Sequence, residues 1–196
     1  MENILLIDTT KGNKIAVANS QIKIAHIINV KNDKDMLSYY ANELFNSFSI
    51  KILAVNTGPG SFTGIRVGLS LVKAMAFASN LPVIATNSFE ILEEELKNCN
   101  IEQPEKPVLV IHSHRYYYYV KDNEIKYLSE EELPDKFLVG EVPGNYKGKF
   151  YRVSPTLNGF LKVVKRKVKQ REFTLIDNLM PLYGKEFIPK RRKKRF

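Results

Sequence analysis

The chain has 196 residues, of which 44% are hydrophobic and 26% are charged, values that suit one large folded domain or two small ones. They exclude a disulfide-stapled mini-protein and a low-complexity or wholly disordered chain. The net charge of +9, from 30 Lys and Arg against 21 Asp and Glu, indicates nucleic acid or an acidic protein surface as a partner.

The positive charge is concentrated in the last quarter of the chain. Residues 1–146 contain 14 basic and 18 acidic residues, whereas residues 147–196 contain 16 basic and 3 acidic residues. Adjacent like charges repel, so the run before the final residue predicts a solvated tail. The run consists of Lys190, Arg191, Arg192, Lys193, Lys194 and Arg195.

Two further features of the sequence limit the cellular compartment in which we expect the protein. Cys99 is the only cysteine, which excludes a disulfide within the chain and agrees with a reducing compartment. The first residues lack a basic signal-peptide region, and no segment approaches the length of a membrane span. We therefore expect a soluble cytoplasmic protein without membrane contact.

The first half of the chain alternates strand and helix patterns. Apolar or alternating runs predict strands over 4–7, 15–18, 22–30, 52–55 and 81–85. Helical spacing predicts helices over 35–48 and 65–78, and a third from the cap Asn87 or Ser88 to about residue 98. Three strands followed by helix–strand units predict an α/β layer with a mixed sheet, antiparallel at first and parallel afterwards.

The second half has weaker patterns. A polar segment with Pro104, over 98–106, predicts a domain boundary, so we expect domains over 1–100 and 101–188 and a basic tail over 189–196. Strands are predicted over 107–112 and 116–120. Short apolar runs follow at 137–139 and 150–153, and a helix is predicted over 173–180.

A glycine-rich turn joins the strand at 52–55 to the apolar helix. Backbone N–H groups at a helix N-terminus favour an anion, which gives one interpretation of the turn; the other is that the glycines only permit tight packing. The turn matches neither a Walker A nor a Gly-x-Gly-x-x-Gly pattern, and Pro59 removes one donor. The candidate anion or nucleotide residues are Gly58, Gly60, Ser61, Thr63 and Gly64.

The amino-acid sequence of this turn resembles that of a known family. Asn56-Thr57-Gly58-Pro59-Gly60-Ser61-Phe62-Thr63-Gly64-Ile65-Arg66-Val67-Gly68, with Ile-Asp-Thr-Thr before it and Leu81-Pro82-Val83-Ile84 after it, resembles the TsaB (YeaZ) family. The resemblance covers about residues 4–92. It implies an actin-like or sugar-kinase-like (ASKHA, ribonuclease H-like) mixed sheet with helices, and a smaller, degenerate second subdomain.

The resemblance also implies a function. TsaB proteins are non-catalytic partners of the catalytic subunit TsaD in bacterial synthesis of threonylcarbamoyl-adenosine on tRNA. TsaD needs a metal-binding histidine pair on the helix after the third strand, and the predicted helix 35–48 contains no histidine. We therefore expect no metal, cofactor or activity in this chain alone, with ATP and metal on TsaD-like and TsaE-like partners, and with tRNA contacted indirectly or through the basic tail.

The helix over 65–78 is apolar nearly all round, so it must be covered on two sides. The pattern leaves open whether a partner covers the second side or the helix is buried within its own domain. The resemblance implies an interface with a TsaD-like subunit, or with a second copy when the protein is isolated. The candidate interface residues are Tyr39, Tyr40, Phe45, Arg66, Val67, Ser70, Leu71, Ala74, Met75 and Ala78.

Other candidates have simpler interpretations. Asp8 at a strand end could contact phosphate or metal, but a lone carboxylate more often caps a turn. His112 and His114 point to one side of a strand and could hold a metal, yet only His26 could join them. Four consecutive tyrosines over 116–119 could stack on bases, although packing in a buried strand is the default.

One segment departs from the family pattern, and two other functions stay open. TsaB proteins usually read close to Asp-Ala-Arg where this chain has His112-Ser113-His114-Arg115, which puts any role of that segment in doubt. The basic run over 162–171 could follow RNA phosphates or simply be solvated. The alternative functions are a free-standing actin-like ATPase or small kinase, disfavoured by its missing phosphate and metal ligands, and a plain RNA-binding module.

Overall fold

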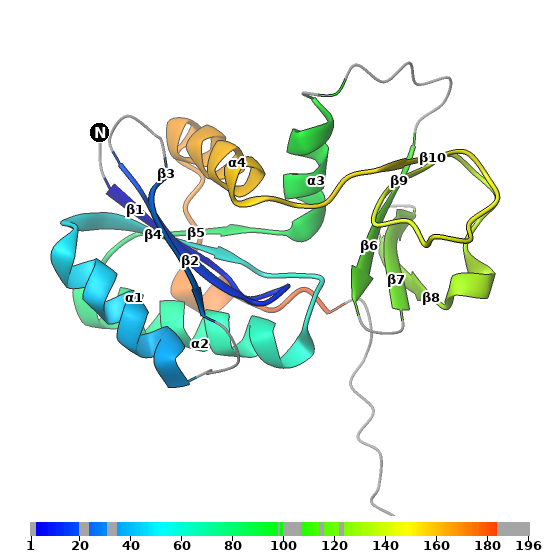
Figure 1. Ribbon diagram of the computed structural model, residues 1–196. Helices are drawn as coiled ribbons and strands as arrows, with labels where there is room; N and C mark the ends of the chain where they lie inside the picture. Colours follow the sequence, from blue (N-terminus) through cyan, green and yellow to red (C-terminus); the bar gives the residue numbers. More distant parts are fainter. Residues whose placement is uncertain are drawn as a thin grey trace, which may run out of the picture.

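A computed structural model describes residues 3–19, 24–30, 35–97, 99, 107–113, 116–121 and 124–183. The predicted basic tail, Lys190 to Arg195, lies outside the described residues, as do His114 and Arg115. The described chain forms two five-stranded sheets with helices around the first of them (Figure 1).

The first sheet has the strand order β3-β2-β1-β4-β5. Its strands are β1 (Asn3–Asp8), β2 (Asn13–Ala18), β3 (Ile24–Val30), β4 (Ile50–Asn56) and β5 (Val83–Thr86). Pairing is antiparallel from β1 to β2 and from β2 to β3, and parallel from β1 to β4 and from β4 to β5. The predicted mixed sheet, antiparallel first and parallel afterwards, is therefore confirmed.

Both faces of the first sheet are covered by helices (Figure 1). On one face lie α1 (Asp35–Ser47) and α2 (Phe62–Ser79), whose apolar sides share a core with Leu5 and Leu53. On the other face α4 (Leu157–Gln170) shares a core with Leu6, Ala16 and Ile52. Because β1 and β4 are central strands, their side chains are buried on both faces.

The second sheet repeats the strand order of the first. Its order is β10-β9-β6-β7-β8, with strands β6 (Val108–Ser113), β7 (Tyr116–Lys121), β8 (Glu124–Leu128), β9 (Leu138–Gly140) and β10 (Phe150–Arg152). Antiparallel pairs join β6 to β7 and β7 to β8, and parallel pairs join β6 to β9 and β9 to β10. Each sheet is thus a meander of three strands extended by two parallel strands, a duplication that fits the actin-like fold.

The helix that follows each sheet packs on the other one. After β5, α3 (Ser88–Leu96) contributes Phe89 and Leu92 to a cluster with Ile111 of the second sheet. After β10, α4 returns to the first sheet, where Phe160 is fully buried. We expected residues 101–188 to form a unit of their own, but residues 157–170 pack on the first sheet because the apolar side of α4 fits there.

The end of the described chain also differs from expectation. The helix predicted over 173–180 is instead a bridge from Thr174 to Val83 followed by the 3₁₀ turn η2 (Ile176–Asn178). Leu179 is buried in the core beneath α2, and the Leu182 N–H donates to the Thr57 carbonyl at 2.9 Å. This C-terminal strap, residues 174–183, therefore runs along the first half instead of forming a separate helix.

Local caps explain where α2 and α3 begin. The Ser61 hydroxyl accepts from the Gly64 N–H at 3.2 Å, so α2 starts at Phe62, earlier than predicted. Of the two predicted caps of α3, Asn87 and Ser88, the structure uses Asn87, which forms a capping box with Glu90. The length and composition of α2 would suffice to cross a membrane, contrary to expectation, but Ile65 and Val72 are buried in the core, as in a helix of a folded domain.

Candidate functional site

Four backbone N–H groups of the glycine-rich turn between β4 and α2 donate hydrogen bonds within the protein. The Thr57 N–H donates to the Thr86 carbonyl at 2.8 Å, and the Ser61 N–H donates to the Thr10 carbonyl at 2.8 Å. The Gly58 N–H donates to the Asn56 side chain at 3.1 Å, and Gly64 donates to Ser61. These four donors are occupied within the protein, which fits the packing interpretation of this part of the turn.

The glycines let α2 approach the turn between β1 and β2. A Cβ at Gly64 would overlap the Thr9 carbonyl oxygen, and one at Gly68 would overlap the Thr9 hydroxyl. Thr9 is 1% exposed, and its hydroxyl is buried without a hydrogen-bond partner in the described part of the chain. The N-terminal half of α2 is therefore pressed against β1 more closely than any larger residue would allow.

Asp8 caps the turn that follows β1. Its carboxylate accepts from the Thr10 N–H at 3.0 Å and from the Thr10 hydroxyl at 2.6 Å, and it is almost fully buried. Asn56 reaches the same carboxylate at 3.4 Å and the Ser88 hydroxyl at 3.2 Å. This buried network joins the ends of β1 and β4 to the start of α3, which agrees with a structural role for Asp8.

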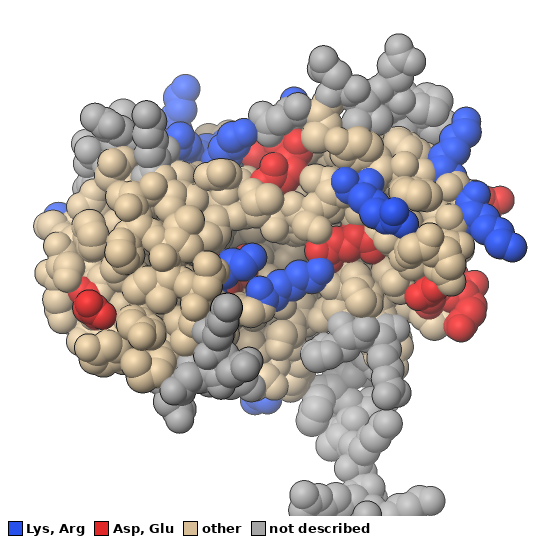
Figure 2. All heavy atoms as spheres, in the orientation of Figure 1, with Lys and Arg blue, Asp and Glu red and all other residues tan. Residues whose placement is uncertain are grey.

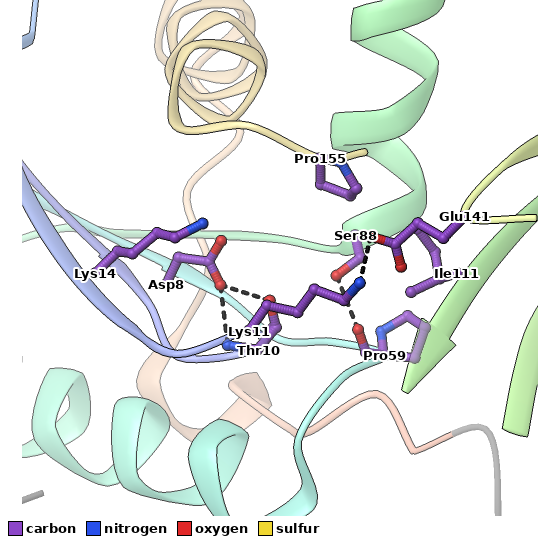
Figure 3. A pocket seen from close by; sticks show the side chains of 9 residues that line it. All are labelled: Asp8, Thr10, Lys11, Lys14, Pro59, Ser88, Ile111, Glu141 and Pro155. Atoms are coloured by element: carbon purple, nitrogen blue, oxygen red, sulfur yellow. Dashed lines mark hydrogen bonds and ion pairs between the residues drawn. The ribbon is translucent and has the colours of Figure 1, made fainter. Parts of the chain in front are cut away.

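The cleft between the two halves is closed by an ion pair (Figure 3). Lys11, from the turn after β1, pairs with Glu141, from the loop after β9. Glu141 also accepts from the His112 N–H at 2.8 Å, and its side chain is 7% exposed. These residues line a recess with a volume of about 10 Å³, which is room for about one water molecule.

The size of this recess bears on the nucleotide hypothesis. Small-molecule sites usually measure hundreds of Å³, and the cleft position here holds an ion pair instead. In the described residues no three His, Cys, Asp or Glu side chains lie together in a way that could hold a metal ion. His112 stacks on Tyr117 with ring centroids 4.6 Å apart, which gives His112 a packing role.

The tyrosine run over 116–119 is also used in packing. β7 is paired on both sides, with β6 and with β8. Tyr117 and Tyr119 pack in a cluster with Val110 on one face of the sheet, and Tyr118 packs with Phe89 on the other. Tyr116 contacts the ring of Tyr127 edge-on at 5.5 Å. The strand thus buries aromatic rings on both of its faces.

The outer side of α1 and α2 is a surface that we call the α1–α2 face. Its exposed residues are Tyr39, Asn42, Glu43, Arg66, Ser70, Ala74, Phe77 and Ala78. Tyr39 is 58% exposed and Phe77 is 85% exposed. The two helices carry only four charged residues, Asp35, Glu43, Arg66 and Lys73. Figure 2 shows few charged atoms where α1 lies, whereas charges gather between the halves and over the second half.

The predicted interface residues fall into two groups. Tyr39, Arg66, Ser70, Ala74 and Ala78 are exposed on the α1–α2 face. The remaining five are half-buried and pack against the core beneath the two helices: Tyr40, Phe45, Val67, Leu71 and Met75. The predicted set therefore combines an exposed surface with the layer that supports it.

Sequence reasoning missed two contributors to this region. Phe77 shares a helical stripe with Ser70 and Ala74, a spacing that could have placed it on the exposed side. Tyr183 of the C-terminal strap stacks on Phe62 with ring centroids 4.8 Å apart. No local pattern indicates that contact, because it joins residues far apart in the chain.

Comparisons with known proteins agree with these features. The family model described as "TsaD: tRNA N6-adenosine threonylcarbamoyltransferase" matches residues 42–138. The chain is 42% identical over 40 residues to the tRNA threonylcarbamoyladenosine biosynthesis protein TsaB of Bacillus subtilis, covering 20% of this chain and 18% of that protein. It is 37% identical over 54 residues to the protein of the same name from Haemophilus influenzae, covering 28% of this chain and 23% of that one.

The matched segments thus span about a fifth of the length of these curated relatives. Over the fold as a whole, the structure is similar to that of YeaZ from Pseudomonas aeruginosa, with a TM-score of 0.67 at 18% identity, covering 93% of this chain and 100% of that one. A second structure, described as similar to peptidase YEAZ of that organism, gives a TM-score of 0.68 at the same identity, 18%, and covers 94% of this chain and 100% of its own. Together with the glycine-rich turn and the duplicated sheet, these matches support the resemblance to the TsaB (YeaZ) family.

Proposed function

We propose that this chain is an accessory subunit in the threonylcarbamoyl-adenosine modification of tRNA and has no catalytic activity of its own. It binds a TsaD-type catalytic subunit through the α1–α2 face, works in the cytoplasm with a TsaE-type ATPase, and leaves ATP and metal to those partners. The names of its relatives support the pathway. The observation that carries the docking role is the exposed α1–α2 face, which has few charged residues and on which Tyr39 and Phe77 are exposed.

The physical case rests on what this face would gain from a partner. Large exposed apolar side chains are uncommon on a surface without function when they gather together, and aromatic residues are enriched in interface cores. Ser70, Ala74 and Ala78 are small, so a partner helix can approach α2 closely. Arg66 lies over the Phe62 ring at 5.3 Å and supplies a polar edge to the same surface.

The experiment measures binding of the full chain to the TsaD-type protein of the same genome by calorimetry. Ala74→Arg places a charge on the face, about one helical turn from Phe77, and we expect affinity to fall about 30-fold or more. Asn158→Arg adds the same charge to α4, on the opposite face of the sheet, and should leave affinity unchanged. Equal binding by all three proteins, or no binding by the wild type, would overturn the docking role.

The alternative of a free-standing ATPase or small kinase is tested with the same protein. Calorimetry of the isolated chain with ATP and Mg²⁺ should show no heat of binding, because the cleft is occupied by Lys11 and Glu141. Tight binding or turnover by the chain alone would instead favour the enzyme. If the isolated chain forms a homodimer through the α1–α2 face, Ala74→Arg should make it monomeric in gel filtration.

A further inference from the structure

Helix α4 has two sides of opposite character. Its inner side is largely apolar, with Phe160, Leu161, Val163 and Val164 buried against the first sheet. Its outer side carries four basic residues spaced three or four apart, which places them along one stripe. We call this set the α4 stripe: Lys162, Lys165, Arg166 and Lys169.

The charge of the α4 stripe is not balanced within the helix. From Leu157 to Gln170 there is no acidic residue, and Arg166 donates to the neutral Gln170 side chain at 3.4 Å. The fifth basic residue, Lys167, points elsewhere and pairs with Glu90 at 2.7 Å. Like charges three and four residues apart on a helix repel each other, so their proximity in the stripe opposes helix stability.

The helix dipole explains only part of this pattern. Cations near a helix C-terminus are favourable within the last turn, which accounts for Lys167 and Lys169. Lys162 and Lys165 lie in the middle turns, where the dipole has little effect. A row of cations along the outer side of a helix that contains no acidic residue is typical of a surface that meets a polyanion.

The position of α4 separates the stripe from the α1–α2 face. The two surfaces cover opposite faces of the first sheet (Figure 1). In Figure 2, Lys and Arg atoms project from the layer in which Figure 1 shows α4. A protein bound to α1 and α2 would therefore leave α4 accessible, so one molecule can hold a protein partner and a polyanion at the same time.

We propose that the α4 stripe binds the phosphate backbone of tRNA. The choice of tRNA rests on the proposed function, whereas the cationic surface is independent of it. An anionic membrane would offer similar charges, but the apolar side of α4 is buried in the core and cannot enter a bilayer. The stripe makes no contact with bases in this proposal, so it positions the substrate without reading its sequence.

The experiment follows the binding of a fluorescently labelled tRNA transcript to the full chain by anisotropy over a range of salt concentrations. The test variant is Lys165→Gln/Arg166→Gln/Lys169→Gln. The control, Lys136→Gln/Lys147→Gln/Lys149→Gln, removes three exposed lysines of the second half. A charge-preserving variant, Lys165→Arg/Lys169→Arg, and a chain ending at Ile188 separate the charge of the stripe from the helix structure and from the basic tail.

The slope of log affinity against log salt is negative, and removal of three phosphate contacts should reduce its magnitude by about 2 to 3, at about 0.7–0.9 per contact. We expect a loss of about tenfold or more at low salt for the test variant and a loss of less than about threefold for the control. The arginine variant should bind like the wild type. The same loss should appear when the test variant is made in the chain ending at Ile188.

Three results would overturn the inference. One is an unchanged affinity and salt slope in the test variant; another is an equal loss in the control, which would show a general effect of net charge. The third is equally tight binding to vesicles of anionic lipid that displaces tRNA. Binding of the TsaD-type protein by the test variant is measured in parallel, so loss of the docking role and loss of the tRNA surface are distinguishable.

Discussion

The two halves of the molecule have the same strand order but different connections. In the first half, helices follow the third and fourth strands, and α1 and α2 cover one whole face of the sheet. In the second half the corresponding connections are the 3₁₀ turn η1 (Glu130–Glu132) and a loop over 141–149. The strand order therefore suffices to maintain the architecture, while the helices determine which half offers a surface to other molecules.

The difference also shows in how each sheet is buried. The outer face of the second sheet is covered by loop residues such as Leu133, Val142 and Tyr146 instead of by a helix. The first sheet is enclosed on both faces, and its central strands have side chains with almost no exposure. Helix α4 follows β10 of the second sheet but packs on the first sheet, so the second half contributes a helix to the core of the first.

The largest expected effect tests whether α4 belongs energetically to the first half. Phe160 is fully buried among residues of the first sheet, so Phe160→Ala should lower the free energy of unfolding by about 3–5 kcal/mol. Denaturant unfolding followed by circular dichroism measures this loss. If the loss is below about 1 kcal/mol, α4 is only loosely attached and the two halves are more independent than the structure indicates.

A matched aromatic residue of the second half provides the control. Phe150 of β10 is 38% exposed. Phe150→Ala removes its edge contact with the Tyr146 ring, at 6.2 Å between centroids, and its contact with the Arg152 guanidinium, which lies 4.5 Å from the ring centroid. We expect a loss of about 1 kcal/mol or less. A cost equal to that of Phe160→Ala would show that the second sheet contributes as much to stability as the first.

The sequence predicts the first half better than the second, because the first half has long strands and helices and the second has short strands joined by loops. Strands β1 and β4 are continuous branched runs, which read as buried strands, and α1 shows a clear helical spacing. Strands β9 and β10 have three residues each, too few for a period to appear. The second half could therefore be predicted only in fragments.

The apolar spacing of α4 could have predicted a helix, but its many basic residues favoured a solvated segment instead. The run over 162–171 suggests a solvated segment when its lysines are counted, yet Phe160, Val164 and Val168 recur at intervals of four, the spacing of a helix side facing a core. The ion pair of Lys11 with Glu141 and the stacking of Tyr183 on Phe62 are different. They join distant segments, so no local pattern predicts them.

The two connections that follow the fourth strand of each sheet give a second test. Gly64 lies where a Cβ would overlap the backbone oxygen of Thr9, whereas a Cβ at Gly144, in the loop after β9, would meet nothing within 4 Å. Gly64→Ala must displace α2 from β1 and should cost about 1–3 kcal/mol. Gly144→Ala should change stability by no more than about 0.5 kcal/mol.

Urea midpoints at a constant m-value measure both substitutions. A small effect at Gly64 would mean that α2 can shift without penalty, and the close approach of helix and strand would lose its importance. A large effect at Gly144 would mean that the second-half loop is packed as tightly as the helix that replaces it in the first half.

The smallest expected effect concerns the ion pair that ties α4 to α3. Burial raises the pKa of Glu90, but the Lys167 ammonium, the Asn87 N–H and the Thr86 hydroxyl more than offset this, and the net pKa lies below its usual 4.5. A lowered folded-state pKa stabilises the protein above 4.5, and this contribution disappears as pH falls through the folded-state pKa. Lys167→Gln should therefore raise the pKa of Glu90 and cost about 1 kcal/mol at neutral pH, since the pair is partly exposed.

The pH dependence separates this ion pair from the other contact of the same lysine. Lys167 also donates to the Ala85 carbonyl at 2.9 Å, and that hydrogen bond does not depend on the charge of Glu90. The stability difference between wild type and Lys167→Gln should thus shrink, without vanishing, as pH falls below the folded-state pKa of Glu90. Lys169→Gln, which removes an exposed charge two residues away, should show no such pH dependence. A difference that stays constant with pH would assign the whole effect to the Ala85 hydrogen bond and leave the crossing of the two helices to apolar packing alone.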